Sequence, residues 1–224
     1  MAPTVGEAFV IKVLLADDED LVRSGLRTIL TSAGDIEVVA ECDDGVHVAD
    51  AARQHRPHVV LLDIRMRSAD GIVALRKLRA LPEPPVVAML TTFDVDEYVQ
   101  EALRIGASGF LLKDTEPEVL IKAVRDLARG GAVLDPKVAA RVLSAVADGE
   151  RAAEPARRLL ASLSDREREV VALIGQGLSN AEIGSALHLS EATVKGYVSA
   201  VLGKIGAVNR VQAALVAYRG GLIA

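Results

Sequence analysis

Six polar side chains in the N-terminal half stand where short apolar runs end, and their types suit phosphoryl chemistry. Crowded carboxylates repel one another, and Mg²⁺ relieves that repulsion while keeping waters and phosphate oxygens in its shell. A carboxylate beside such an ion can attack phosphorus, and an ammonium can offset the charge on the transferring group. The six residues are Asp17, Asp18, Asp63, Thr91, Thr92 and Lys113.

Each of these residues has an ordinary explanation when it is taken alone. An acidic pair at a helix start is favoured by the helix dipole, a threonine after a strand is usually a turn residue, and a terminal lysine is usually solvated. The joint placement favours chemistry, with Asp63 as the nucleophile that forms an aspartyl phosphate. In that state the Thr91 hydroxyl can donate to a phosphoryl oxygen, which gives the product a contact that the free state lacks.

The elements that must position these residues alternate along the first half of the chain. Short runs rich in Val, Ile and Leu have the length of buried strands, and segments with three- and four-residue apolar spacing separate them. Five strand–helix units in order predict a parallel sheet with helices on both faces, whose functional crevice lies at the carboxyl ends of the strands. The predicted strands cover residues 10–16, 36–40, 58–62, 86–90 and 109–112.

The second half of the chain is predicted to be helical after a linker. Residues 148–162 are rich in Ala, Arg and Glu with little periodicity, and a short helix is expected over 136–147. Serine caps then mark successive helix starts, with short spacers that suit a helix-turn-helix. The predicted capping signals are Ser164-x-x-Glu167, Ser179-x-x-Glu182, Ser190 and, earlier in the chain, Thr115-x-x-Glu118.

The segment 190–204 is predicted to be an amphipathic helix. Val194, Val198 and Val201 fall on one side with helical spacing, and Lys195 and Ser199 fall on the other. The first side suits packing in a core. The second offers one cation among small residues, which lets a backbone approach a DNA groove closely, although it also fits an ordinary surface helix.

Charge and composition limit the classes of protein. The net charge of −5 divides into −8 for residues 1–154 and +3 for residues 155–224, so only the second part suits nucleic-acid binding. No apolar run approaches the ~20 residues that span a bilayer, and residues 1–10 lack a signal-peptide pattern. We therefore expect a cytoplasmic protein without a membrane partner.

Cysteine and histidine do not indicate a metal or redox centre. The single cysteine, Cys42, excludes an internal disulfide and reads as a small apolar filler. The pair His55 and His58 straddles Pro57 and cannot present a regular helical pair, and His47 and His188 complete no ligand set.

Four segments of the first half resemble the signature segments of a response-regulator receiver domain. These are ADDED at 16–20, LLDIRMRSADG at 61–71, MLTTFD at 89–94 and GASGFLLKD at 106–114. The resemblance implies a flavodoxin-like five-stranded sheet in the order 2-1-3-4-5, with Asp63 as the phosphorylation site. It also implies Mg²⁺ ligation by Asp18, Asp63 and the Arg65 carbonyl, with Asp17 acting mostly through water, and Phe110 as the switch aromatic.

This chain departs from the receiver pattern at two positions. Arg67 stands where the family often has Pro, which predicts a looser and more basic loop after Asp63. Asp114 follows Lys113 where Pro is common. Neither change removes a reacting group.

Residues 163–218 resemble the LuxR-type helix-turn-helix, most specifically in SNAEI at 179–183 and LSEATVK at 189–195. The resemblance implies a four-helix, all-α domain in which 179–187 is the scaffold and 190–204 enters the major groove. The Gly196-Tyr197 pair departs from the family and leaves the sequence preference open. The predicted DNA contacts are Asn180, Thr193, Lys195, Gly196, Ser199, Lys204 and Arg210, and the predicted dimer contacts are Val211, Ala214, Leu215 and Tyr218.

Together the two halves are similar to the NarL/FixJ class of response regulators. We expect a receiver over 1–130, a linker over 131–158 and a DNA-binding domain over 159–224. The expected partners are a sensor histidine kinase, promoter DNA and a second copy of the chain, which dimerises when phosphorylated or DNA-bound; we do not classify the chain as an enzyme.

Two alternatives remain open at this point. In one, the receiver is never phosphorylated and serves only as a dimerisation or ligand-binding module, which beryllofluoride binding would discriminate. In the other, the sheet belongs to a phosphatase, although the sequence shows neither an extra general acid nor a substrate cap. Turnover of small phosphate esters would test the second alternative.

Overall fold

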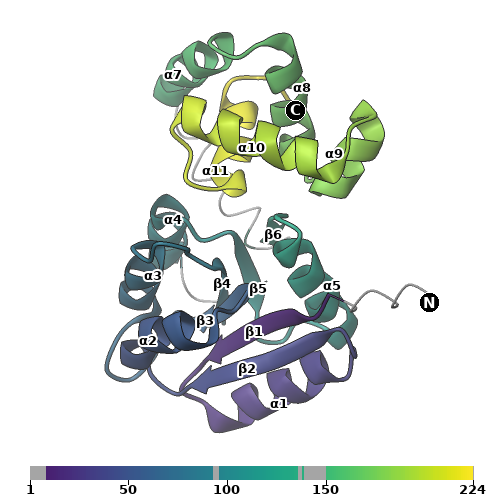
Figure 1. The fold of residues 1–224 in the computed structure, drawn as a ribbon. Coiled ribbons are helices and arrows are strands. Elements are labelled where there is room, and N and C mark those ends of the chain that lie inside the picture. Colours follow the sequence, from purple (N-terminus) through teal and green to yellow (C-terminus); the bar gives the residue numbers. More distant parts are fainter. Residues whose placement is uncertain (1–8, 93–95, 136–137, 139–149, 224) are drawn as a thin grey trace, which may run out of the picture.

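The computed structural model describes residues 9–92, 96–135, 138 and 150–223, and its N-terminal part is a parallel sheet with helices on both faces (Figure 1). The strand order β2-β1-β3-β4-β5-β6 confirms the predicted order and adds a sixth strand. This strand has only two residues, too few to show a periodic pattern in sequence. The strands are β1 (Ile11–Ala16), β2 (Ile36–Cys42), β3 (Val59–Asp63), β4 (Val86–Thr91), β5 (Gly109–Leu112) and β6 (Val133–Leu134).

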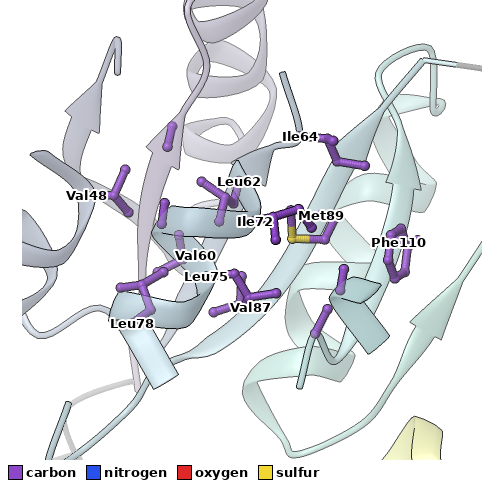
Figure 2. Packing of buried hydrophobic residues seen from close by; sticks show 14 of the residues in the cluster. Val48, Val60, Leu62, Ile64, Ile72, Leu75, Leu78, Val87, Met89 and Phe110 are labelled. Carbon is purple, nitrogen blue, oxygen red and sulfur yellow. The ribbon is translucent and has the colours of Figure 1, made fainter. Parts of the chain in front are cut away.

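The sheet is buried on both faces, which explains why the sequences of its strands are continuous apolar runs. Within β1, Val13 and Leu15 belong to a core with α1 and α5, whereas Leu14 and Ala16 belong to the core on the opposite face. Figure 2 shows part of the second core, where Leu75 of α3 lies against strand residues of β3 and β4. The helices of this part are α1 (Asp20–Thr31), α2 (Gly45–His55), α3 (Gly71–Arg79), α4 (Asp96–Ile105) and α5 (Pro117–Ala128).

The start of α5 corrects one sequence prediction. The capping box predicted from Thr115 and Glu118 is absent, because α5 begins at Pro117 and its N-cap is Glu116, without a side-chain cap hydrogen bond. Proline is favoured at the first helical position, where its fixed φ and missing N–H cost nothing. Thr115 therefore lies one residue too early to cap the helix.

The C-terminal part is all helix around a third core. Ser164 and Ser179 form complete capping boxes with Glu167 and Glu182, and Ser190 accepts from the Thr193 amide, as predicted. A further helix, α7, precedes the four expected ones. The helices are α7 (Glu150–Ala161), α8 (Asp165–Gly175), α9 (Asn180–Leu187), α10 (Glu191–Ile205) and α11 (Arg210–Arg219).

The predicted domain boundaries remain predictions, and the division at 158/159 falls inside α7. Most of the helix predicted over 136–147 lies outside the described residues. Among the described residues, no single helix is long and apolar enough to cross a membrane; α10 and α11 meet the length and composition criterion only as a pair bent by 62°. Both helices contribute residues to the third core.

The two parts of the chain meet where α11 lies against α4 (Figure 1). Val211, in the first turn of α11, is 2% exposed and packs in the same cluster as Phe110, Leu103 and Ala107 of the N-terminal part. Leu215 packs against that cluster one turn later. The first two turns of α11 therefore share an apolar core with the α/β part.

Candidate functional site

The polar residues that follow separate strands converge on one cavity at the carboxyl end of the sheet. The cavity has a volume of about 330 Å³. It is lined by Asp18, Glu19, Asp63, Ile64, Arg65, Thr91, Thr92 and Lys113. A larger hollow of about 780 Å³ lies at the amino ends of β3 and β4, but Glu83 is its only carboxylate lining residue. The acidic cavity is therefore the one that suits phosphoryl chemistry.

The Lys113 ammonium lies at the centre of a group of carboxylates. Its Nζ is 3.0 Å from Asp17 Oδ2, 3.0 Å from Asp63 Oδ2 and 2.9 Å from Glu19 Oε1. Burial alone would lower the pKa of Lys113, but its contacts with the carboxylates of Glu19, Asp63 and Asp17 outweigh burial and raise it. Lys113 is thus held as a cation beside the predicted nucleophile.

Asp63 is a buried carboxylate in an unfavourable setting. It is 4% exposed. Burial raises the pKa of Asp63 to about 6, and the charge of Asp17 adds to this rise, although Lys113 and the Arg65 amide oppose it. At pH 7 the group remains mostly ionised and carries the charge that a nucleophile needs.

The three aspartates could hold a cation. One oxygen from each of Asp17, Asp18 and Asp63 lies within 4.8 Å of the other two. Asp17 is fully buried, and its Oδ2 has no hydrogen bond of acceptable geometry, despite the nearby ammonium. A buried carboxylate oxygen without a hydrogen-bond donor is costly, and a bound divalent cation or a water in its shell would satisfy it. The residues present therefore fit a hard cation such as Mg²⁺.

The predicted switch threonines Thr91 and Thr92 line this cavity, whereas Phe110 is not among its lining residues. Thr91 is 3% exposed, and its hydroxyl donates to the Thr92 carbonyl at 2.7 Å. Phe110 is fully buried in the core on the α2–α4 face, on β5 opposite Met89 of β4 (Figure 2). The Thr91 hydroxyl would have to leave its carbonyl partner in order to donate to a phosphoryl oxygen.

The sequence did not indicate two lining residues of the cavity, Glu19 and Ile64, nor the contact of Arg67 with Asp18. Glu19 belongs to the quoted ADDED segment, but its contact with Lys113 connects residues 94 positions apart. Arg67 was noted only as a departure from the family. Its Nε lies 3.6 Å from Asp18 Oδ2, and its Nη2 donates to the Asp18 carbonyl at 3.3 Å. Only the fold shows these contacts of Glu19 and Arg67.

The polar side of α10 is open to solvent. Lys195, Gly196 and Ser199 are exposed, whereas Val194 and Val201 are fully buried in the third core. Thr193 is also exposed, but its hydroxyl is 2.8 Å from that of Ser190, within the cap of the helix. The α/β part therefore leaves the predicted groove-facing residues of α10 uncovered.

Two other predicted DNA contacts are buried where the two parts meet, a region that we call the seam. The seam consists of Asn180, Asn209, Arg210, Val211 and Gln212. Asn180 Nδ2 donates to the Arg129 carbonyl at 3.2 Å, and Arg210 Nη1 donates to the Gly130 carbonyl at 3.1 Å. These two carbonyls lie just beyond the C-terminus of α5, where helix carbonyls lack partners within the helix.

The seam makes the same kind of contact at the end of α4. Asn209 Nδ2 donates to the Ala107 carbonyl at 2.6 Å, and Gln212 Nε2 donates to the Leu103 carbonyl at 2.7 Å. The C-terminal part therefore supplies hydrogen-bond donors to the ends of two helices of the α/β part. Their carbonyls carry the negative end of the helix dipole, which favours donors and cations.

Arg210 has an unusual environment for a guanidinium. It is 5% exposed and also donates to Asn180 Oδ1 at 2.8 Å and to the Leu178 carbonyl. Burial lowers the pKa of Arg210 to about 10, still high enough to keep it charged. Neutral oxygens rather than a carboxylate satisfy this buried cation. In this arrangement neither Arg210 nor Asn180 is available to DNA.

The remaining predicted contacts divide between paired and exposed residues. Lys204 is exposed, with its Nζ 2.8 Å from Glu167, and a hydrogen bond from Lys204 lowers the pKa of Glu167 to about 2. Among the predicted dimer contacts, Val211 and Leu215 pack with the core of the α/β part, Ala214 is half-buried, and Tyr218 is 36% exposed. Half of that dimer surface is therefore covered by the α/β part.

This fold and site define a class of protein, and comparison with known families agrees. The family model of the response regulator receiver domain matches residues 13–125, and that of bacterial regulatory proteins of the luxR family matches residues 161–217. The chain belongs to the response regulators that join a receiver domain to a LuxR-type DNA-binding domain, and is a transcription regulator of the two-component systems.

Particular relatives share nearly the whole length of the chain. An uncharacterized transcriptional regulatory protein of Bacillus subtilis strain 168, YxjL, is 41% identical over 95% of this chain and 97% of its own. The transcriptional regulatory protein LiaR of the same strain is 36% identical over 96% and 100%. The crystal structure of the response regulator ChrA, from a heme-sensing two component system, is 37% identical, with a TM-score of 0.53 over 96% and 100% of the chains.

Proposed function

We propose that Asp63 accepts a phosphoryl group from the phosphohistidine of a sensor histidine kinase, and that this modification regulates binding to promoter DNA. The supporting observation is the convergence of Asp18, Asp63 and Lys113 on one cavity, with the buried Asp17 carboxylate beside them, in a chain whose α10 presents an exposed LuxR-type face. The reaction replaces a P–N bond by a P–O bond on Asp63, and the leaving histidine nitrogen takes up a proton.

Each residue of the pocket has a distinct part in this reaction. Asp63 supplies the attacking oxygen, and the Lys113 ammonium stabilises negative charge on the transferring group. Asp18, Asp63 and the Arg65 carbonyl would hold Mg²⁺ directly, with Asp17 acting through water. The ion would supply charge neutralisation for the carboxylates and the phosphoryl oxygens.

The seam connects the modification to DNA binding. Asn180 and Arg210 reach DNA, and Val211 and Leu215 reach a second copy of the chain, only when the seam opens. Thr91 and Phe110 are the switch: when the Thr91 hydroxyl turns to a phosphoryl oxygen, the packing around Phe110 changes on the core that also holds Val211. A modified receiver that contacts α11 less favourably shifts the population towards the open form.

A phosphotransfer assay with Mg²⁺ tests the assignment of the acceptor. The parent should become labelled, Asp63→Ala should not, and the exposed carboxylate variant Asp50→Asn should label like the parent. Equal labelling of the parent and Asp63→Ala would eliminate Asp63 as the acceptor.

DNA binding by a seam variant tests the connection between the two parts. Gln212→Ala removes the hydrogen bonds to the Leu103 and Arg104 carbonyls, so the unmodified variant should bind promoter DNA more tightly than the unmodified parent. Gln100→Ala, an exposed position on α4, is the matched control. Identical DNA affinities for Gln212→Ala and the parent, with and without phosphoryl donor, would contradict a regulatory seam.

A further inference from the structure

The Lys113 ammonium is surrounded by carboxylates in the unmodified pocket, and it donates hydrogen bonds to two of them, Glu19 and Asp63. An ammonium has three donors, and three carboxylates, those of Asp17, Asp63 and Glu19, lie within 3.0 Å of it. A phosphoryl oxygen on Asp63 would compete with these carboxylates for the ammonium. Asp17 is fully buried, whereas the Glu19 side chain is 60% exposed and can return to water. Glu19 is therefore the exchangeable partner.

The position of Glu19 is not explained by its own helix. Glu19 is the N-cap residue of α1, yet its side chain makes no cap hydrogen bond there. Its amide donates to Asp17 Oδ1 at 2.9 Å, which places its backbone at the pocket. Its carboxylate accepts a hydrogen bond from Lys113, which follows β5. The local structure thus directs a negative charge to the rim.

A positive charge, that of Arg67, contacts Asp18 at the same cavity. Arg67 follows β3, and its guanidinium contacts both the side chain and the carbonyl of Asp18, although its side chain is 75% exposed. Asp18 is one of the three aspartates that fit a cation. Arg67 therefore occupies one side of a carboxylate that the cation would use.

We propose that Glu19 and Arg67 are positioning residues that tune the pocket in opposite directions, one for the divalent cation and the other for the phosphoryl group. This inference rests on the proposed function of the pocket. Glu19 acts through Lys113: it adds negative charge that favours the cation, and it withholds a donor from the phosphoryl oxygens. Arg67 acts through Asp18: it competes with the cation and adds positive charge that favours the phosphoryl group.

Two neutral variants of the full chain test the opposite signs. Calorimetry gives the affinity for Mg²⁺ alone, and a beryllofluoride titration at saturating Mg²⁺ gives the affinity for a phosphoryl analogue. Glu19→Gln should bind Mg²⁺ more weakly and beryllofluoride more tightly than the parent. Arg67→Gln should do the reverse. Because both side chains are largely exposed, each change should be about two- to fivefold.

Controls separate this tuning from a general structural effect. Glu37→Gln and Arg53→Gln are exposed charge changes away from the cavity and should leave both affinities unchanged. The double variant Glu19→Gln, Arg67→Gln should return towards the parent values. The differences should shrink at ~1 M salt, where the Debye length is about 3 Å.

The possible results are distinguishable. If the parent binds both ligands and either variant moves both affinities in the same direction, or neither affinity changes, the tuning role is overturned while the proposed function stands. If the parent binds neither Mg²⁺ nor beryllofluoride, the proposed function of the pocket and this inference both fail.

Discussion

The acidic pocket and the exposed face of α10 are both polar, but they are built in opposite ways. In the pocket, Asp17 and Asp63 are almost completely removed from water, and side chains from distant parts of the chain hold one another. On α10, Lys195, Gly196 and Ser199 are exposed to solvent, and the helix alone sets their positions. The buried carboxylates of the pocket carry an unfavourable electrostatic contribution to the stability of the fold. The exposed residues of α10 carry little.

Function and stability are therefore expected to be coupled in the pocket and independent of each other on α10. Burying like charges destabilises the folded state until a ligand relieves them, so changes in the pocket should alter stability as well as function. Exposed polar residues usually contribute little to stability, so changes on α10 should alter function alone.

The largest effect is expected for Asp63→Asn. Removing the buried charge should raise the free energy of unfolding at pH 7.5 by about 1–3 kcal/mol, given the raised pKa of about 6. Because the folded-state pKa lies above the unfolded value of 3.8, the parent loses stability as pH rises through 6. The gain of the variant should therefore vanish below about pH 4.

Thermal unfolding of the parent and Asp63→Asn across this pH range measures the effect. Asp50→Asn, an exposed carboxylate paired with Arg53, should show no such gain. A stability of Asp63→Asn equal to or below that of the parent at pH 7.5 would show that the pocket is not electrostatically destabilised.

The next effect concerns Lys195, where function should change without stability. Lys195→Gln should weaken promoter binding by about 1–3 kcal/mol and reduce the salt slope by about 1 if its partner is a phosphate. The free energy of unfolding should stay within about 0.5 kcal/mol of the parent. Fluorescence anisotropy on labelled DNA at several salt concentrations, beside denaturant unfolding, would reveal any coupling that contradicts the contrast.

Gly196 offers a smaller, purely local effect. A Cβ at this position would meet nothing within 4 Å, and glycine inside a helix costs about 1 kcal/mol relative to alanine. Gly196→Ala should therefore raise the free energy of unfolding by about that amount. Gly184→Ala is an informative counterpart, because its Cβ would lie 2.7 Å from the Leu189 carbonyl and should destabilise the chain. Urea unfolding would reject the prediction if Gly196→Ala lowered stability.

The smallest effect contrasts Glu167 with Asp63. A hydrogen bond from Lys204 and the Ser164 amide lower the pKa of Glu167 to about 2, below its ordinary value of 4.5. This carboxylate therefore contributes stability above pH 4.5 that is lost as pH falls through about 2. Glu167→Gln should be less stable than the parent at neutral pH, and the difference should close over that window. A difference independent of pH would indicate lost packing rather than lost charge.

Local signals explain how much of the fold was predictable. A few neighbouring residues are enough to predict a strand or a helix cap. The structure confirms the strand runs, the capping boxes at Ser164 and Ser179, and the cap at Ser190. The box predicted at Thr115 was wrong because Pro117 is a stronger local signal for the start of a helix. The sixth strand was missed because two residues make no pattern.

The pocket was partly predictable for a topological reason. In a parallel sheet the carboxyl ends of the strands share one edge, so Asp63 and Lys113 could be placed together from their positions after strand runs. Glu19 and Arg67 could not be assigned contacts in this way, because neither follows a strand directly. Their contacts depend on the path of a helix start and of a loop.

By itself, the sequence determined the strands, the helix caps, the exposed face of α10 and the end of the sheet at which the acids gather. The tertiary structure alone shows that Asn180 and Arg210 are buried against the α/β part rather than exposed to solvent. The physical reason is that their partners are main-chain carbonyls at the ends of α4 and α5. Every helix ends in such carbonyls whatever its side chains, so no residue type in the sequence marks which ones another domain will meet.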